Sequence, residues 1–73
     1  MSGKGKTSTV VATYETDMGL ILNWLKLNKA ISSHGSVYET KIGSYAVRVR
    51  HSMSKKDIRY LVKERFGSFA KVK

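Results

Sequence analysis

The chain has 73 residues, of which 14 are Lys or Arg and 5 are Asp or Glu, so its formal net charge is +9. This length leaves room for one small domain, and the absence of cysteine excludes a disulfide framework and a thiolate metal site. Stability must therefore come from packing or from self-association, and a homodimer is one way to enlarge so small a core.

The positive charge is concentrated in the C-terminal half of the chain. Residues 41–73 contain ten basic and two acidic residues, whereas residues 1–40 carry a net charge of only +1. A polyanion bound to such a segment releases its counterions, so nucleic acid or an anionic membrane surface is the first partner class to expect. The simpler alternative is that the excess charge only keeps a small protein in solution.

The first predicted segment is a mobile basic arm over residues 1–6, which has two glycines, two lysines and no apolar residue after Met1. Gly5-Lys6-Thr7 is too short a match for a phosphate-binding loop, which needs an earlier glycine and a preceding strand. The single domain is expected over residues 7–73. It begins with a strand at residues 7–14, most of which are β-branched or aromatic, and either face of this strand is a candidate for burial.

A first helix is predicted from Thr16 or Asp17, either of which can cap it, to about Ile31. Its apolar residues cover a wide arc, which predicts a deeply buried helix: Met18, Leu20, Ile21, Leu22, Trp24, Leu25, Leu27 and Ile31. The segment is too short and too interrupted to span a bilayer. Trp24 is most simply a core anchor, but the surplus apolar arc also fits a contact of residues 18–31 with a protein partner or a second copy of the chain.

A turn at residues 32–36, with His34-Gly35 at its centre, follows this helix. Strands at residues 37–40 and 44–51 then form a predicted hairpin. In its second strand one set of alternate residues is apolar and the other is mostly basic: Tyr45, Val47 and Val49 against Ala46, Arg48 and Arg50. One face of this strand is therefore suited to the core and the other is cationic.

A second helix is the best-defined element of the sequence, predicted from an N-cap at Ser54 to a C-terminal glycine at Gly67. Its apolar face contains Ile58, Leu61, Val62 and Phe66, and a basic stripe on another face contains Lys56, Arg59 and Lys63. Arg65 falls within the apolar face, where it can snorkel to solvent or join a ligand surface. Residues 68–73 alternate again and predict a last strand.

This order of elements predicts an α+β domain of the βαββαβ split-βαβ (ferredoxin-like) type, a sandwich with a four-stranded antiparallel sheet and two helices on one face. Right-handed crossovers would place the first and third strands in the centre. The architecture resembles that of RNA-recognition-motif domains. Because Gly43-Ser44-Tyr45-Ala46-Val47 lacks the paired aromatic positions of that family's motif, no residue role is carried over from it.

The uncovered face of this sheet is the candidate nucleic-acid-binding site. Its predicted residues are Arg48, Arg50, Lys71, Lys73, Phe69 and Tyr38. Basic side chains bind phosphates while aromatic rings stack on unpaired bases, which favours single-stranded RNA or DNA over a duplex. The stripe of Lys56, Arg59 and Lys63 is a secondary basic surface, with an ordinary solvated helix face as its alternative.

Catalysis and metal binding have little support in the sequence. His34 and His51 are the only histidines, and neither has a spaced partner, so both are expected to be structural or solvated. No catalytic residue, cofactor or metal is predicted, and the lack of cysteine fits a reducing compartment such as the cytoplasm.

The alternative function is that of a small phage- or plasmid-type regulator or inhibitor, which binds a larger host protein such as RNA polymerase or a nuclease. Its basic surface would meet an acidic patch, or would compete for a nucleic-acid channel. Binding to an anionic membrane surface is a weaker alternative, because the basic residues and the most apolar helix lie on different elements.

Overall fold

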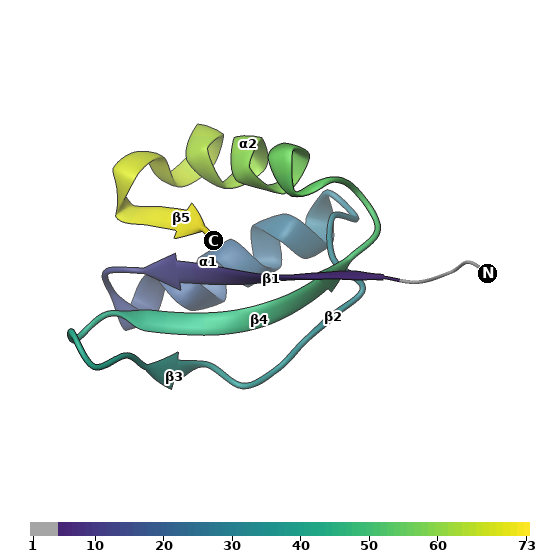
Figure 1. Ribbon diagram of the computed structural model, residues 1–73. Coiled ribbons are helices and arrows are strands. Elements are labelled where there is room, and N and C mark those ends of the chain that lie inside the picture. The colour runs from purple at the N-terminus through teal and green to yellow at the C-terminus, as the bar shows by residue number, and fades with distance from the viewer. Residues whose placement is uncertain (1–4) are drawn as a thin grey trace.

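The computed structural model describes residues 5–73, so most of the predicted arm at residues 1–6 lies outside the described residues. The elements in chain order are β1 (Lys6–Ala12), α1 (Glu15–Leu27), β2 (Ser33–His34), β3 (Tyr38–Glu39), β4 (Tyr45–His51), α2 (Lys55–Phe66), a 3₁₀ turn η1 (Gly67–Phe69) and β5 (Ala70–Val72). The described chain is a small α+β domain with two helices and a five-strand antiparallel open sheet, broadly consistent with a ferredoxin-like fold (Figure 1).

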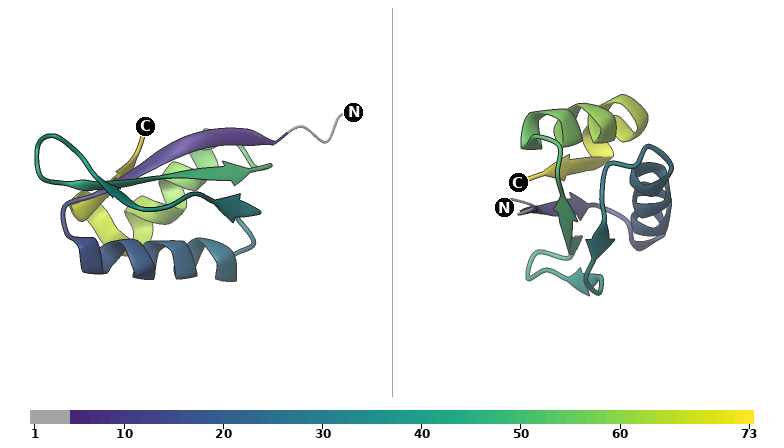
Figure 2. Two further views of the ribbon diagram at one scale, coloured as in Figure 1. Left: turned by 90° about the horizontal axis from the view of Figure 1, so that it is seen from below. Right: turned by 90° about the vertical axis from the view of Figure 1, so that its right-hand side faces the viewer.

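β1 and β4 lie in the centre of the sheet, as predicted for the first strand and for the second strand of the hairpin. The spatial order is β2-β4-β1-β5, and β3 also pairs with β4. β1 pairs along its whole length with β4, from Lys6 opposite His51 to Ala12 opposite Tyr45. Both helices lie on one side of the strands, as the left-hand view of Figure 2 shows, and the other side is left uncovered.

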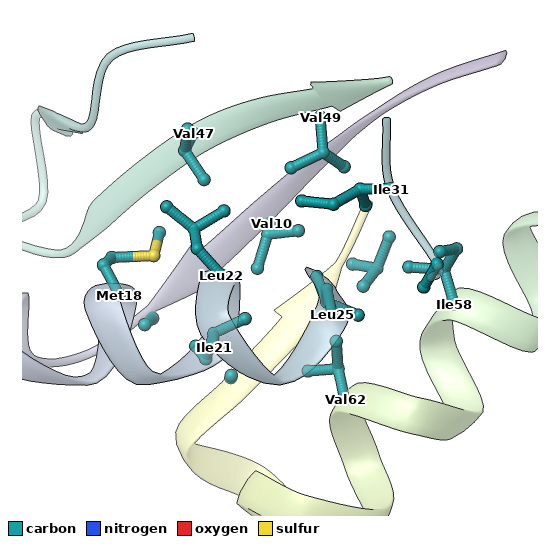
Figure 3. Packing of buried hydrophobic residues seen from close by; sticks show 14 residues of the cluster. Val10, Met18, Ile21, Leu22, Leu25, Ile31, Val47, Val49, Ile58 and Val62 are labelled. Carbon is teal, nitrogen blue, oxygen red and sulfur yellow. The ribbon is translucent and has the colours of Figure 1, made fainter. Parts of the chain in front are cut away.

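The core lies between the helices and the covered face of the sheet (Figure 3). Its most deeply buried members come from the two central strands and from both helices: Val10, Val47, Val49, Ile21, Leu25, Ile58 and Val62. Burial of one such side chain contributes about 1.5–3 kcal/mol, so the alternation predicted for residues 44–51 is what attaches the sheet to the helices.

α2 begins and ends where the sequence predicts. The Ser54 hydroxyl accepts a hydrogen bond from the Asp57 N–H at 3.2 Å, and Gly67 ends the helix with a φ of 58°, which glycine adopts easily. Arg65 is exposed, although it falls among the apolar positions of the helix wheel. Its guanidinium lies 5.5 Å from the centre of the Trp24 ring, a cation–π contact between α2 and α1.

Trp24 anchors α1 on α2, in agreement with the prediction of a packing role. Its indole N–H donates to the Leu61 carbonyl at 3.0 Å. α1 nevertheless ends at Leu27 rather than at Ile31, because Lys29 takes a φ of 54° and turns the chain away from the helix axis. It also begins at Glu15, with no capping side chain from either predicted residue.

The prediction that α1 is deeply buried is wrong. Leu20 is 59% and Leu27 is 70% exposed, because the sheet and α2 cover only the part of the arc that contains Met18, Ile21, Leu22 and Leu25. An apolar stripe on α1 is therefore left facing solvent. Within residues 5–73 no helix is long and apolar enough to cross a membrane.

The strand predicted at residues 37–40 is present but shortened to β3, and β2 lies within the turn predicted at residues 32–36, which makes five strands rather than four. Ser33 of β2 lies opposite Arg50, and Tyr38 of β3 lies opposite Ala46. His34 is the last paired residue of β2 and lies opposite Val49, so the edge has residues 35–37 before Tyr38, whereas β4 has only residues 47 and 48 between Ala46 and Val49. One residue is extra, which is the pattern of a β-bulge.

The last predicted strand is shorter than expected, because residues 67–69 form η1 before β5 begins. The pairing with β1 nevertheless extends past both ends of β5. The Thr13 N–H donates to the Phe69 carbonyl at 3.1 Å, and the Lys73 N–H donates to the Thr9 carbonyl at 2.8 Å. Phe69 and Lys73 are thus held against β1 although neither is inside a strand.

Candidate nucleic-acid interface

The uncovered side of the sheet, here called the open face, is built from three rows of side chains. Residues paired directly across antiparallel strands point to the same side, so the rows follow from the register. The first row is Ser33, Arg50 and Thr7, the second is Arg48, Thr9 and Lys73, and the third is Tyr38, Ala46, Val11 and Lys71. None of these residues is acidic, so a bound anion would meet no side-chain carboxylate within the rows.

The structure brings the predicted cations of the open face together. Arg48 and Arg50 lie on the central strand β4 and Lys71 lies on the edge strand β5, and all three are exposed. Neighbouring strands are about 4.8 Å apart, so β4 and β5, which flank β1, are separated by roughly 10 Å. Arg48 and Lys71 lie in neighbouring rows and Arg50 lies one row further, so the three charges extend over more than the Debye length of about 8–10 Å at moderate salt and suit an anion with several charges.

A hollow of about 280 Å³ lies at the first row, and Thr7, Ser33, Arg48 and Arg50 contribute to its lining. Guanidinium groups and hydroxyls are donors that suit phosphate oxygens. Gly5 lies against this site, because a Cβ added there would be 2.8 Å from Cγ of Arg50. The glycine therefore leaves the space that the stem of Arg50 occupies.

Tyr38 reaches the open face because of the β-bulge at residues 35–37. Strict alternation from Ser33 would place Tyr38 on the covered face, but the extra residue reverses the alternation and pairs Tyr38 with Ala46 on the open face. Half of the Tyr38 side chain is exposed. The predicted aromatic group is thus present at the edge of the third row.

Phe69 lies at the end of the open face, on η1 and not on a strand as predicted. It is 56% exposed, and its ring packs against Tyr14 with 6.2 Å between ring centres. Phe69 is therefore separated from the two arginines but close to Lys71, with which it lines a common hollow.

The secondary basic stripe meets the open face at Lys71. Arg59 and Lys63 of α2 line a hollow of about 480 Å³ together with Lys71 and Val72, along the free edge of β5. The Nε–H of Arg59 donates to the Val72 carbonyl at 3.1 Å, so this arginine already has a structural partner. Lys56, the third member of the stripe, is exposed in the first turn of α2.

The two histidines have local hydrogen-bond partners. His51 is 1% exposed; its Nδ1–H donates to the Met53 carbonyl at 2.7 Å, and its Nε2 lies 2.8 Å from the Ser8 hydroxyl. Because a carbonyl can only accept, Nε2 of the neutral ring is left to accept from Ser8. His34 is exposed, with Nδ1 2.8 Å from the Gly35 carbonyl. Among the described residues no cluster of three His, Cys, Asp or Glu is placed to hold a metal ion.

Sequence reasoning missed several contributors to the open face. Thr7, Thr9 and Ser33 add hydroxyls beside the arginines, and only the strand register reveals them. Ile42 is the other omission: it is 89% exposed at the turn between β3 and β4. A β-branched apolar residue next to a turn glycine was the available signal.

Comparisons with protein-family models, with curated proteins and with solved structures found no match to this chain. Function is therefore inferred from the charge and geometry of the open face.

Proposed function

We propose that this protein is a small, non-enzymatic nucleic-acid-binding protein that holds single-stranded RNA or DNA across the open face. The observation that supports this most is the register of β1 with its two neighbours, which aligns Arg48, Arg50 and Lys71 on the side of the sheet that no helix covers. Outward positions of a sheet are commonly polar, but an uncovered face with several cations and no acidic residue in its rows favours a polyanion.

Each predicted residue has a role in this proposal. Arg48, Arg50, Lys71 and Lys73 neutralise phosphates, and the hydroxyls of the first row donate to phosphate oxygens. Tyr38 and Phe69 offer exposed rings on which unpaired bases stack. We also take β2 and β3 as one bulged edge strand, which makes the fold a four-stranded split βαβ sandwich.

The test is fluorescence anisotropy with labelled single-stranded RNA, single-stranded DNA and duplex DNA between about 50 and 200 mM salt. Four neutralised phosphates on a single strand give a log–log salt slope of about 2.8, so wild-type affinity should fall about 50-fold over this range. Arg48→Ala/Arg50→Ala should bind more weakly, with a slope near 1.4 and a fall of about 7-fold.

Lys26→Ala/Lys55→Ala is the matched control, because it removes two positive charges from exposed positions on the helices. It should keep most of the wild-type affinity and salt slope. Equal losses in the two double variants would mean that net charge, and not the open face, attracts the nucleic acid. If binding survives in Arg48→Ala/Arg50→Ala, the next variant is Lys56→Ala/Arg59→Ala/Lys63→Ala.

The alternative function, a regulator that binds a larger host protein, is favoured by one observation. Leu20 and Leu27 are exposed on α1, and with Trp24 and Phe66 they line a hollow of about 130 Å³. Under this alternative, wild-type protein binds no nucleic acid at low salt and retains a stoichiometric protein partner after nuclease treatment. Leu20→Ser/Leu27→Ser should lose that partner, and sedimentation of the pure chain tests whether α1 joins two copies instead.

A further inference from the structure

The open face ends in a second hollow, of about 240 Å³, whose walls differ from those of the hollow at the arginines. Five of its nine lining residues are apolar, among them Val11 of β1, Ile42 and Phe69. The others are the hydroxyl-bearing residues Thr13, Ser44 and Ser68 and one cation, Lys71. At the other end of the face the lining of the first hollow is basic and hydroxyl-bearing. The two ends of the open face therefore differ in chemical character, with mostly apolar residues at one end and two arginines at the other.

Ile42 has no packing role that explains its position. It is 89% exposed and lies in a turn that is already closed by polar contacts, since the Thr40 and Ser44 hydroxyls are 2.7 Å apart and the Thr40 N–H donates to the Ser44 carbonyl at 2.8 Å. Gly43 completes the turn with a φ of 87°. The backbone therefore holds an exposed apolar side chain in a defined place, at the rim of the hollow.

Phe69 is also exposed, and contacts with residues 13 and 14 fix its position. Its ring lies against that of Tyr14, and its carbonyl accepts the Thr13 N–H at 3.1 Å. An aromatic ring fixed in this way loses little conformational entropy when a ligand stacks on it. The hollow is smaller than the roughly 300–1,000 Å³ of pockets that hold drug-sized molecules, so it suits a single ring system.

The distance to the arginines identifies the ligand class. Val11, beside this hollow, and Thr7, beside the first one, are four residues apart on β1, which corresponds to about 14 Å at a rise of about 3.4 Å per residue. A ligand that spans both ends needs a flat apolar ring at one end and negative charge at the other. A short stretch of single-stranded nucleic acid has both.

We propose that the hollow between Ile42 and Phe69 binds one unpaired nucleobase of a strand whose phosphates lie on Arg48 and Arg50. This inference rests on the proposed function and deepens it, because a base can enter the hollow only when it is not paired. Lys71 then neutralises the phosphate next to the inserted base. The hollow is accordingly the part of the site that distinguishes a single strand from a duplex.

The test compares two probes of equal charge, a short oligothymidylate and an abasic deoxyribose-phosphate strand of the same length. Wild type should prefer the strand with bases by about 5- to 150-fold for each base stacked on an aromatic side chain, and this hollow accounts for one such base while Tyr38 can stack another. Phe69→Ala and Ile42→Ser should each reduce this preference, with unchanged salt slopes because neither removes a charge.

Tyr60→Ala and Leu27→Ser are the matched controls, since they remove an exposed aromatic and an exposed aliphatic side chain from the helices. Both should keep the wild-type preference. Phe69→Ala also loses the contact with Tyr14, so its thermal unfolding is measured alongside. Ile42→Ser, at a nearly fully exposed turn position, gives the same test if Phe69→Ala is unstable.

The base site is refuted if wild type binds both strands equally, or if the preference is undiminished in both Phe69→Ala and Ile42→Ser. In either case the dependence on Arg48 and Arg50 can still hold, and the proposed function then stands without the base site. Failure of wild type to bind either strand at about 50 mM salt would refute the proposed function and this inference together.

Discussion

Replacing Ser8 by alanine tests the polar contact inside the core. Ser8 is 4% and His51 is 1% exposed, and the Ser8 hydroxyl lies 2.8 Å from Nε2 of His51. Among the described residues, every fully buried side-chain nitrogen or oxygen has a hydrogen-bond partner. Ser8→Ala would break that condition, because Nε2 would lose its donor while Nδ1 stays bonded to the Met53 carbonyl.

The expected cost follows from this geometry. A buried polar group left without its partner costs about 1–3 kcal/mol, whereas an exposed hydroxyl costs little. For a domain of this size each 1 kcal/mol lowers the melting temperature by about 4–8 °C, so Ser8→Ala should melt roughly 4–24 °C below wild type. Ser52→Ala, an exposed serine next to His51, is the control and should change stability by less than about 0.5 kcal/mol.

A double-mutant cycle separates the contact from simple loss of volume. Thermal and urea unfolding of Ser8→Ala, His51→Leu and the double variant should show a coupling free energy of about 0.5–3 kcal/mol, with the double variant less unstable than the sum of the singles. Additive effects, or a Ser8→Ala cost equal to that of Ser52→Ala, would refute the assignment of the hydrogen bond.

Three further predictions concern single positions. Leu25→Ala should destabilise the protein by about 2–5 kcal/mol in urea unfolding, and Leu27→Ala by less than about 0.5 kcal/mol, because the first side chain is fully buried and the second is exposed; equal costs would contradict this difference in burial between two positions of α1. Gly5→Ala should weaken oligonucleotide binding in anisotropy, with little change in melting temperature, because the added Cβ displaces Arg50. Gly43→Ala should cost about 1–3 kcal/mol, measured by thermal unfolding, because the turn needs a φ of 87°; an unchanged melting temperature would refute the turn geometry.

The parts of the fold that the sequence predicted are those determined by local rules. Ser54 and Gly67 mark the ends of α2 because capping needs a hydroxyl and a permissive glycine at fixed places. The alternation from Tyr45 to His51 separates the core side from the cationic side of β4 because side chains in a strand point to opposite faces in turn. Arg48 and Arg50 were therefore correctly placed on the open face.

The parts that the sequence did not predict depend on tertiary contacts. α1 ends at Leu27 because the chain turns back toward the sheet at Lys29, and lysine is a residue type that gives no warning of a positive φ. The wide apolar arc of α1 predicts full burial. The sheet and α2 cover only one side of this helix, however, so Leu20 and Leu27 remain exposed. The hollow at Ile42 and Phe69 joins residues far apart in the sequence, which no local pattern can bring together.

The bulge at residues 35–37 has a consequence for how the protein behaves at high concentration. The outer edge of β4 is covered by two strands of only two residues each, so no long row of free backbone groups is offered to another chain. If one of residues 35–37 were deleted, the edge would pair with β4 without a bulge from Ser33 to Tyr38. The alternation of side chains would then leave the tyrosine on the open face. The shortened chain would also present a straight edge, which is the template for edge-to-edge aggregation that bulged strands avoid.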